Sequence, residues 1–128
     1  MENKQKSRPE LPEEIRDGIS STAEEFQNKI ARPIIKMQSD LLVAHLKQKL
    51  ITSKIELNQL SSAKQEAVLT GLFIKDQAFK REVIGMVIGH FSLEEYQTYI
   101  EISKEINRRI TQIVLNRCLN LVLGKKEK

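Results

Sequence analysis

The sequence is poor in the residues from which disulfides and metal sites are built. Its 128 residues include one cysteine, Cys118, and two histidines, His45 and His90. A single cysteine excludes a disulfide within the chain and is typical of the reducing cytoplasm. Neither histidine lies in a ligand motif such as His-x-x-x-His, so a metal or catalytic site would need convergent carboxylates from elsewhere. We therefore expect no enzyme activity, no metal and no cofactor.

Long apolar runs are also missing. No stretch approaches the roughly 18 apolar residues that a membrane-spanning helix needs. Residues 1–6 lack the apolar core of a signal peptide. Hydrophobic residues make up 40% of the chain and charged residues 30%, as in ordinary soluble proteins. We expect one cytoplasmic domain without membrane contact.

A dense basic block is absent, although the formal net charge is +4. The basic tail, residues 125–128, is short. The best local candidate for nucleic-acid binding is Lys75–Arg81, but Asp76 and Glu82 neutralise much of this stretch. Tryptophan, a strong stacking residue, does not occur in the chain. A nucleic-acid-associated regulator is therefore an alternative function and not the preferred one.

The stretch from Phe91 to Leu123 contains neither glycine nor proline, and the rest of the chain is expected to pack against it. Ser92 and Glu95 have the spacing of a capping box at the start of a helix. Gly124 is a typical helix stop. About 31 helical residues would form a rod of roughly 46 Å. Glu105 and its i+4 neighbour Arg109 should form an ion pair on its surface.

Upstream, Thr22 and Glu25 have the spacing of a second capping box. This predicts a flexible arm over residues 1–21 and a helical domain over residues 22–124. Pro33 either begins a new helix or kinks a continuous one, and Arg32 before it should leave helical geometry.

The helix after Pro33 should reach about Ile51 and carry two apolar stripes. The first consists of Ile34, Met37, Leu41, His45 and Gln48, and the second of Ile35, Leu42, Leu46 and Leu50. Two adjoining stripes indicate that the helix has neighbours on more than one side.

Two shorter helices are expected next, over residues 63–74 and 77–88. Ser62 with Gln65 and then Asp76 supply their start signals. The run Val83–Ile88 is rich in β-branched residues, and periodicity alone does not separate a helix from a strand. A helix is favoured because a lone strand would leave its backbone groups unpaired.

Two glycines and a histidine mark the end of the second of these helices. Gly85 and Gly89 fit close helix packing better than a phosphate loop. His90 should hydrogen-bond the last helical carbonyls after the cap at Gly89. The sequence as a whole predicts an all-α bundle of four to five helices, with the 92–123 helix as its spine.

The last helix is also the predicted interface. Its expected buried stripe consists of Tyr96, Ile100, Ser103, Ile106, Ile110, Ile113, Val114, Cys118 and Leu121, flanked by Tyr99 and Ile102. Because a 46 Å rod would overhang a domain of about 36 Å, its far end should lack cover. The predicted self-association surface is Ile110, Ile113, Val114, Cys118, Leu121 and Val122. The preferred function is a non-enzymatic helical interaction or scaffold protein that forms a homodimer, and a small enzyme ranks third.

Two motifs resemble a small uncharacterised bacterial family. They are Arg-Pro-Ile-Ile-Lys-Met-Gln-Ser-Asp-Leu-Leu at residues 32–42 and Ile-Gly-His-Phe-Ser-Leu-Glu-Glu-Tyr at residues 88–96. The similarity covers roughly residues 22–122. Some members carry the label glyoxalase, which implies a βαβββ metal-binding fold with His and Glu ligands. This sequence has neither the strands nor the ligand spacing, so the resemblance implies no catalytic residues here.

Overall fold

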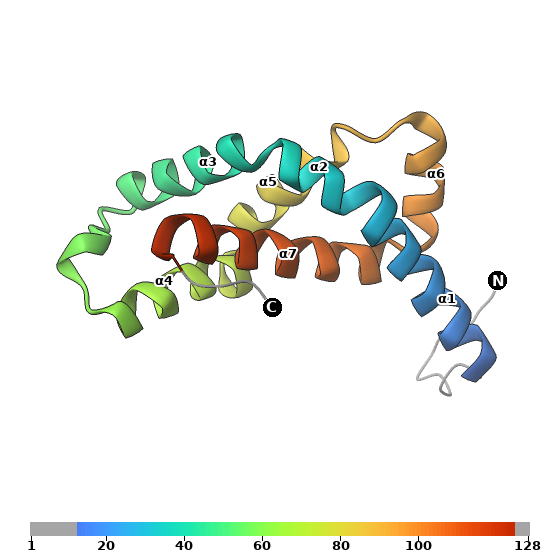
Figure 1. Cartoon of the computed structure of the whole chain (residues 1–128), viewed down its shortest axis with the longest axis horizontal. Helices are drawn as coiled ribbons and strands as arrows, with labels where there is room; N and C mark the ends of the chain where they lie inside the picture. Colours follow the sequence, from blue (N-terminus) through green and yellow to red (C-terminus); the bar gives the residue numbers. More distant parts are fainter. Residues whose placement is uncertain (1–12, 125–128) are drawn as a thin grey trace.

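The computed structural model describes residues 13–124, which form helices joined by short connections (Figure 1). The α-helices are α1 (Glu13–Phe26), α2 (Arg32–Met37), α3 (Ser39–Thr52), α4 (Ser62–Lys75), α5 (Gln77–Ile88), α6 (Leu93–Glu101) and α7 (Ser103–Leu123). A π-helical turn, η1 (Gln27–Ala31), joins α1 to α2, and a 3-10 turn, η2 (Leu57–Gln59), follows α3. The described residues contain no strand, so the all-α prediction is confirmed, including the helix over Val83–Ile88.

Helix α7 is the spine of the bundle, as predicted. Helices α1 to α5 all contact it, and it runs through the middle of the molecule in Figure 1. The side chains that it buries are Ile106, Ile110, Val114, Leu115 and Cys118. It ends at Gly124, whose φ of 76° is the left-handed conformation that glycine adopts without strain.

The predicted 31-residue helix is two helices. The capping box is present, since Ser92 Oγ accepts a hydrogen bond from Glu95 N at 3.0 Å and Glu95 Oε1 accepts one from Ser92 N at 2.8 Å. The first helix nevertheless ends at Glu101, because Ile102 has a φ of −131° and a ψ of 27°. As a result α6 lies crosswise to α7 at one end of the bundle (Figure 1).

The bend at Ile102 also changes which side chains are buried. Tyr99 and Ile102, predicted to flank the stripe, enter the core. The Tyr99 hydroxyl donates a hydrogen bond to Asn107 Oδ1 at 2.8 Å, which ties α6 to the start of α7. Tyr96 and Ile100 are exposed. The predicted stripe is therefore wrong in its first half, because tertiary packing bends a chain that no glycine or proline marks.

Pro33 lies in a continuous helical path from α1 through η1 to α2. Arg32 keeps helical geometry, with φ −60° and ψ −45°, and its N–H bonds to Gln27 O, five residues back. The wider π-turn accommodates a residue that has no N–H and whose ring crowds the preceding turn. The alternative of a continuous helix is confirmed, and the predicted departure of Arg32 from helical geometry is wrong.

The start of the helical domain differs from the prediction as well. Thr22 lies inside α1, which is already helical at Glu13, so it is not an N-cap. Residues 13–21, assigned to the arm, therefore belong to a helix. The rest of the predicted arm and the basic tail lie outside the described residues.

The two stripes after Pro33 have different environments. The second faces the core, since Ile35, Leu42, Leu46 and Leu50 are buried. In the first, Met37 and Leu41 are 62% and 55% exposed. The prediction of neighbours along both stripes is therefore wrong for this pair, because the helices of the described chain do not cover them.

Side-chain caps fix the ends of α4 and α5. Ser61, not Ser62, caps α4 through Lys64 N at 3.3 Å. Gln65 donates to the carbonyls of Leu57 and Leu60 and so holds the preceding loop. Asp76 caps α5 as predicted, with Oδ1 accepting from Phe79 N at 3.0 Å.

Asp76 should make stability depend on pH. The hydrogen bond from Phe79 N, with the nearby Lys49 ammonium, holds the pKa of Asp76 below its usual range. A lowered pKa in the folded state stabilises the fold above the unfolded-state pKa, near 4, and this contribution is lost as the pH falls through the folded pKa. Asp76→Asn keeps a capping oxygen but loses the ion pair with Lys49 at 3.1 Å.

The Tm of Asp76→Asn should therefore lie below that of the unmodified protein at neutral pH. The two should converge in acid, as measured by thermal unfolding between about pH 2 and 7. Lys49→Gln should reduce the difference, because it removes the same ion pair. A difference independent of pH would contradict this assignment.

Candidate interaction surfaces

The predicted self-association surface on α7 is largely covered by the chain itself. Ile110, Val114 and Cys118 are at most 1% exposed, and Ile113 and Val122 are half-buried against the core, whereas Leu121 is exposed. The prediction assumed a rod that overhangs the domain. The bend shortens α7 to 21 residues, and α3 and α4 both pack against it. These six residues do not form an open apolar face.

An exposed apolar stripe lies on α6 instead. Leu93, Tyr96 and Ile100 follow helical spacing on one face and are 75%, 43% and 54% exposed. On the adjoining face Tyr99 packs against Phe91, with ring centroids 5.5 Å apart. We call Leu93, Tyr96 and Ile100 the α6 stripe.

Sequence reasoning missed the α6 stripe because it treated residues 92–123 as one helix. In that prediction Tyr96 and Ile100 belong to the same buried stripe as Ile106 and Ile110. The usable signal was the presence of two adjoining apolar pairs, Tyr96 with Ile100 and Tyr99 with Ile102, on one short segment. A helix that packs against the core along one face needs only one such apolar pair.

Charges of both signs surround the corner between α6 and α7. A groove of about 480 Å³ at the bend is lined by Ile100, Glu101, Ile102, Ser103, Lys104, Glu105 and Arg108. One wall of this corner is therefore apolar, and its rim carries two carboxylates and two cations.

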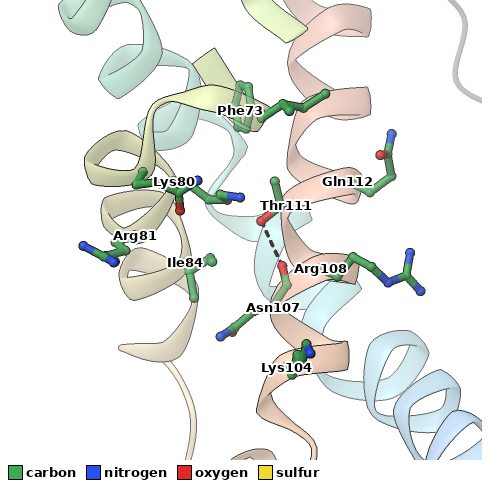
Figure 2. A pocket seen from close by; sticks show the side chains of 11 residues that line it. Phe73, Lys80, Arg81, Ile84, Lys104, Asn107, Arg108, Thr111 and Gln112 are labelled. Carbon is green, nitrogen blue, oxygen red and sulfur yellow. Dashed lines mark hydrogen bonds between the residues drawn. The ribbon is translucent and has the colours of Figure 1, made fainter. Parts of the chain in front are cut away.

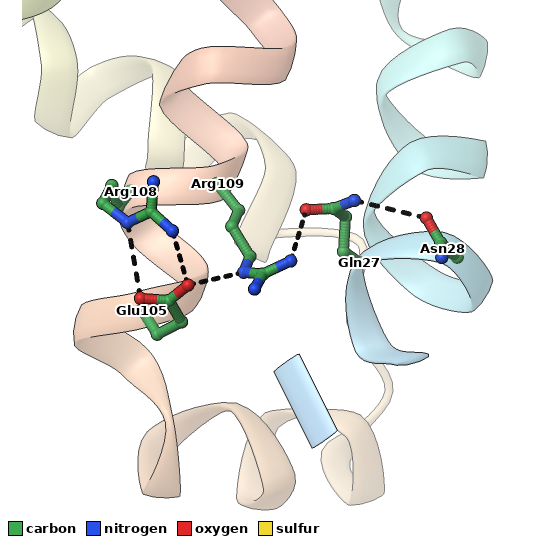
Figure 3. Close-up of polar contacts among 5 residues, drawn as sticks. All are labelled: Gln27, Asn28, Glu105, Arg108 and Arg109. Atoms are coloured by element: carbon green, nitrogen blue, oxygen red, sulfur yellow. Dashed lines mark hydrogen bonds and ion pairs between the residues drawn. The ribbon is translucent and has the colours of Figure 1, made fainter. Parts of the chain in front are cut away.

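Glu105 is the centre of a polar network that joins α7 to η1 (Figure 3). Its carboxylate accepts from Arg108 Nη2 at 2.6 Å and from Arg109 Nε at 2.7 Å. Arg109 Nη1 in turn donates to Gln27 Oε1 at 3.1 Å. The hydrogen bond from Arg108 is the main cause that lowers the pKa of Glu105. The predicted ion pair between Glu105 and Arg109 is confirmed.

The two histidines make separate contacts. His45 stacks on Phe79 with ring centroids 5.4 Å apart, and its Nε2 lies 2.9 Å from Glu82 Oε1. The His90 Nε2 lies 2.7 Å from the Gln38 amide nitrogen. The predicted bonding of the His90 ring to the last helical carbonyls is therefore corrected to a contact with α2–α3, because the turn after α5 directs the ring there.

Cys118 is a buried thiol, 1% exposed. Burial raises its pKa to about 12, so the reactive thiolate is scarce at neutral pH. We predict negligible labelling by a thiol reagent such as dithiobis(nitrobenzoate) in native buffer and one equivalent in denaturant. Rapid native labelling would contradict this prediction, and a Cys118→Ala variant provides the blank.

A second groove, of about 440 Å³, runs between α5 and α7 with the end of α4 beside it (Figure 2). Its apolar lining consists of Phe73, Ile74 and Ile84, and its cations are Lys80, Arg81, Lys104 and Arg108. The neutral polar residues Gln77, Asn107, Thr111 and Gln112 complete the lining. None of these residues carries a carboxylate. We call this the α5–α7 groove.

The described residues show no site with evident chemistry. Among the side chains that the structure describes, no three or more of His, Cys, Asp or Glu are placed to hold a metal ion. None of the helices in this part of the chain has the length and apolar content needed to cross a bilayer. Comparison with protein-family models, curated proteins and solved structures finds no match for the chain. The family resemblance of the two motifs therefore stays a prediction.

Proposed function

We propose that the protein is a non-enzymatic helical interaction protein that self-associates as a homodimer through the α6 stripe. The observation that carries the proposal is the exposure of Leu93, Tyr96 and Ile100 together on one face of a helix that the chain itself holds in place. Contiguous exposed apolar side chains commonly mark a protein interface.

The rigidity of α6 supports this assignment. Phe91 contacts Phe26 edge-to-face, with ring centroids 5.3 Å apart, and also contacts Tyr99. These rings fix α6 on the body of the protein, so its open face is presented in one orientation. A preorganised surface loses little conformational entropy on binding.

The charges beside the stripe favour a second copy of the chain as the partner. A two-fold interface brings the same patch together twice and so must be self-complementary. The corner beside Ile100 carries Glu101 and Glu105 together with Lys104 and Arg108. Carboxylates of one copy would therefore meet cations of the other.

Sedimentation equilibrium at micromolar concentration tests the proposal. The unmodified protein should sediment as a dimer of the 14.8 kDa chain. A Tyr96→Glu, Ile100→Glu variant should sediment as a monomer, because it places four unpaired carboxylates in the interface. Both positions are exposed, so the variant should keep its helical circular dichroism spectrum.

The matched control is Met37→Glu with Leu41→Glu, which adds the same charge on another exposed apolar pair. This variant should remain dimeric. A monomeric unmodified protein would refute self-association. If the control variant is monomeric and the α6 variant remains dimeric, the protein self-associates, but not through the α6 stripe.

A nucleic-acid-associated regulator is the second candidate function. The observation in its favour is that Lys80 and Arg81, which belong to the basic stretch found in the sequence, line one groove with Lys104 and Arg108. The groove offers no exposed aromatic ring on which a base could stack, since the aromatic residue of its lining, Phe73, is buried.

A further inference from the structure

We propose that the α5–α7 groove binds an acidic amphipathic helix of a partner protein. The groove contains none of the three residues of the α6 stripe, although it shares Lys104 and Arg108 with the corner beside that stripe. This inference concerns a different partner and so goes beyond self-association. Two features of the groove support the proposal, its apolar lining and the cations of its walls.

The lining of the groove provides apolar side chains that a docked helix can contact. Ile74 at the end of α4 is 56% exposed, and Ile84 of α5 is half-buried. Phe73 beside them is fully buried and contacts Phe79 edge-to-face, which makes this lining rigid. An added helix would place apolar residues at i, i+3 and i+4 on these side chains, as in helix-in-groove recognition.

The cations of the groove lie on both walls. Lys80 and Arg81 belong to α5, and Lys104 belongs to α7. Among the side chains that the structure describes, no carboxylate lies within ion-pair distance of these three cations. Arg108, by contrast, is paired with Glu105.

The positions of these side chains suit a helix with two acidic flanks. Figure 2 shows Lys80 reaching across toward α7, and Arg81 and Arg108 extending away from the groove on its two sides. Carboxylates on the flanks of a docked helix would meet Lys80 from the α5 wall and Lys104 from the α7 wall. Steering by such charges raises the association rate as well as the specificity.

Nucleic acid fits the same groove less well. Unstacked bases bind on exposed aromatic rings, whereas the exposed surface here is the aliphatic side chain of Ile74. The described lining thus favours apolar side chains flanked by carboxylates over a phosphate backbone.

The test uses the full chain labelled with nitrogen-15 and a synthetic peptide of about 18 residues, long enough to be helical. The peptide carries leucine on one face and glutamate on both flanks. The amide chemical-shift changes of the labelled protein should saturate as peptide is added. They should map to the groove around Ile74, Ile84 and Thr111. Affinity should fall as salt rises, because exposed ion pairs are screened.

Lys80→Glu with Arg81→Glu should weaken binding at least about tenfold, or 1.4 kcal/mol. Lys36→Glu with Lys47→Glu changes the net charge equally on α2 and α3, and should leave the affinity unchanged. A peptide with lysine in place of glutamate should prefer the Lys80→Glu, Arg81→Glu variant.

Three results would overturn the proposal. They are the absence of saturable shifts, shifts that map away from the groove, and tighter binding of a thymidine or uridine oligonucleotide at the groove than of the acidic peptide. The last result would assign the groove to nucleic acid. The sedimentation of the unmodified protein is measured without the peptide, so a failure of this proposal is distinguishable from a failure of the dimer.

Discussion

Ile106→Ala should lower the free energy of unfolding by about 2–5 kcal/mol, the range seen when a buried aliphatic side chain is truncated to alanine. Ile106 is fully buried at the start of α7. Truncation removes its burial free energy and leaves a cavity that the neighbouring helices fill incompletely. Urea unfolding followed by circular dichroism measures the loss.

Ile100→Ala is the matched control, because it makes the same substitution six residues earlier on α6. Ile100 is exposed, so the expected change is within about 0.5 kcal/mol. The measurement is made at a concentration low enough for the proposed dimer to be dissociated, so that self-association does not contribute. In an unbroken helix over 92–123 both residues would lie on the buried stripe and cost similar amounts. Equal losses would therefore contradict the bend at Ile102.

Phe79→Ala should be the most destabilising single substitution proposed, at about 3–5 kcal/mol. Phe79 is 1% exposed and contacts Phe73 edge-to-face with ring centroids 5.2 Å apart. It also stacks on His45 of α3. Its loss therefore loosens α3, α4 and α5 together, and chemical unfolding should show a lower midpoint.

Phe79→Leu keeps most of the apolar volume and should cost much less, because a volume-conserving change leaves a smaller cavity. His45→Ala removes the stacked ring while leaving the core residue, and should also have the smaller effect. If His45→Ala proves as destabilising as Phe79→Ala, the contacts of the His45 ring with Phe79 and Glu82, and not the buried volume, hold these helices together.

The all-α fold and the local ends of its helices could be predicted from the sequence by itself. Asp76 caps α5 and the Ser92–Glu95 box begins α6, because these interactions join residues three apart and need no tertiary partner. Gly124 ends α7 for an equally local reason. The spacing of Ile106, Ile110, Val114 and Cys118 likewise identified the buried face of the spine.

Only the tertiary structure decided the bend at Ile102 and the π-turn before Pro33. It also decided where the candidate sites lie. No residue type marks the bend; it exists because burying Tyr99 and Ile102 against the bundle stabilises two helices over one. That bend exposes the α6 stripe, and the packing of α3 and α4 against α7 covers the predicted α7 interface. The α5–α7 groove likewise depends on packing, since it brings Lys80 and Lys104 together from helices that are separate in the sequence.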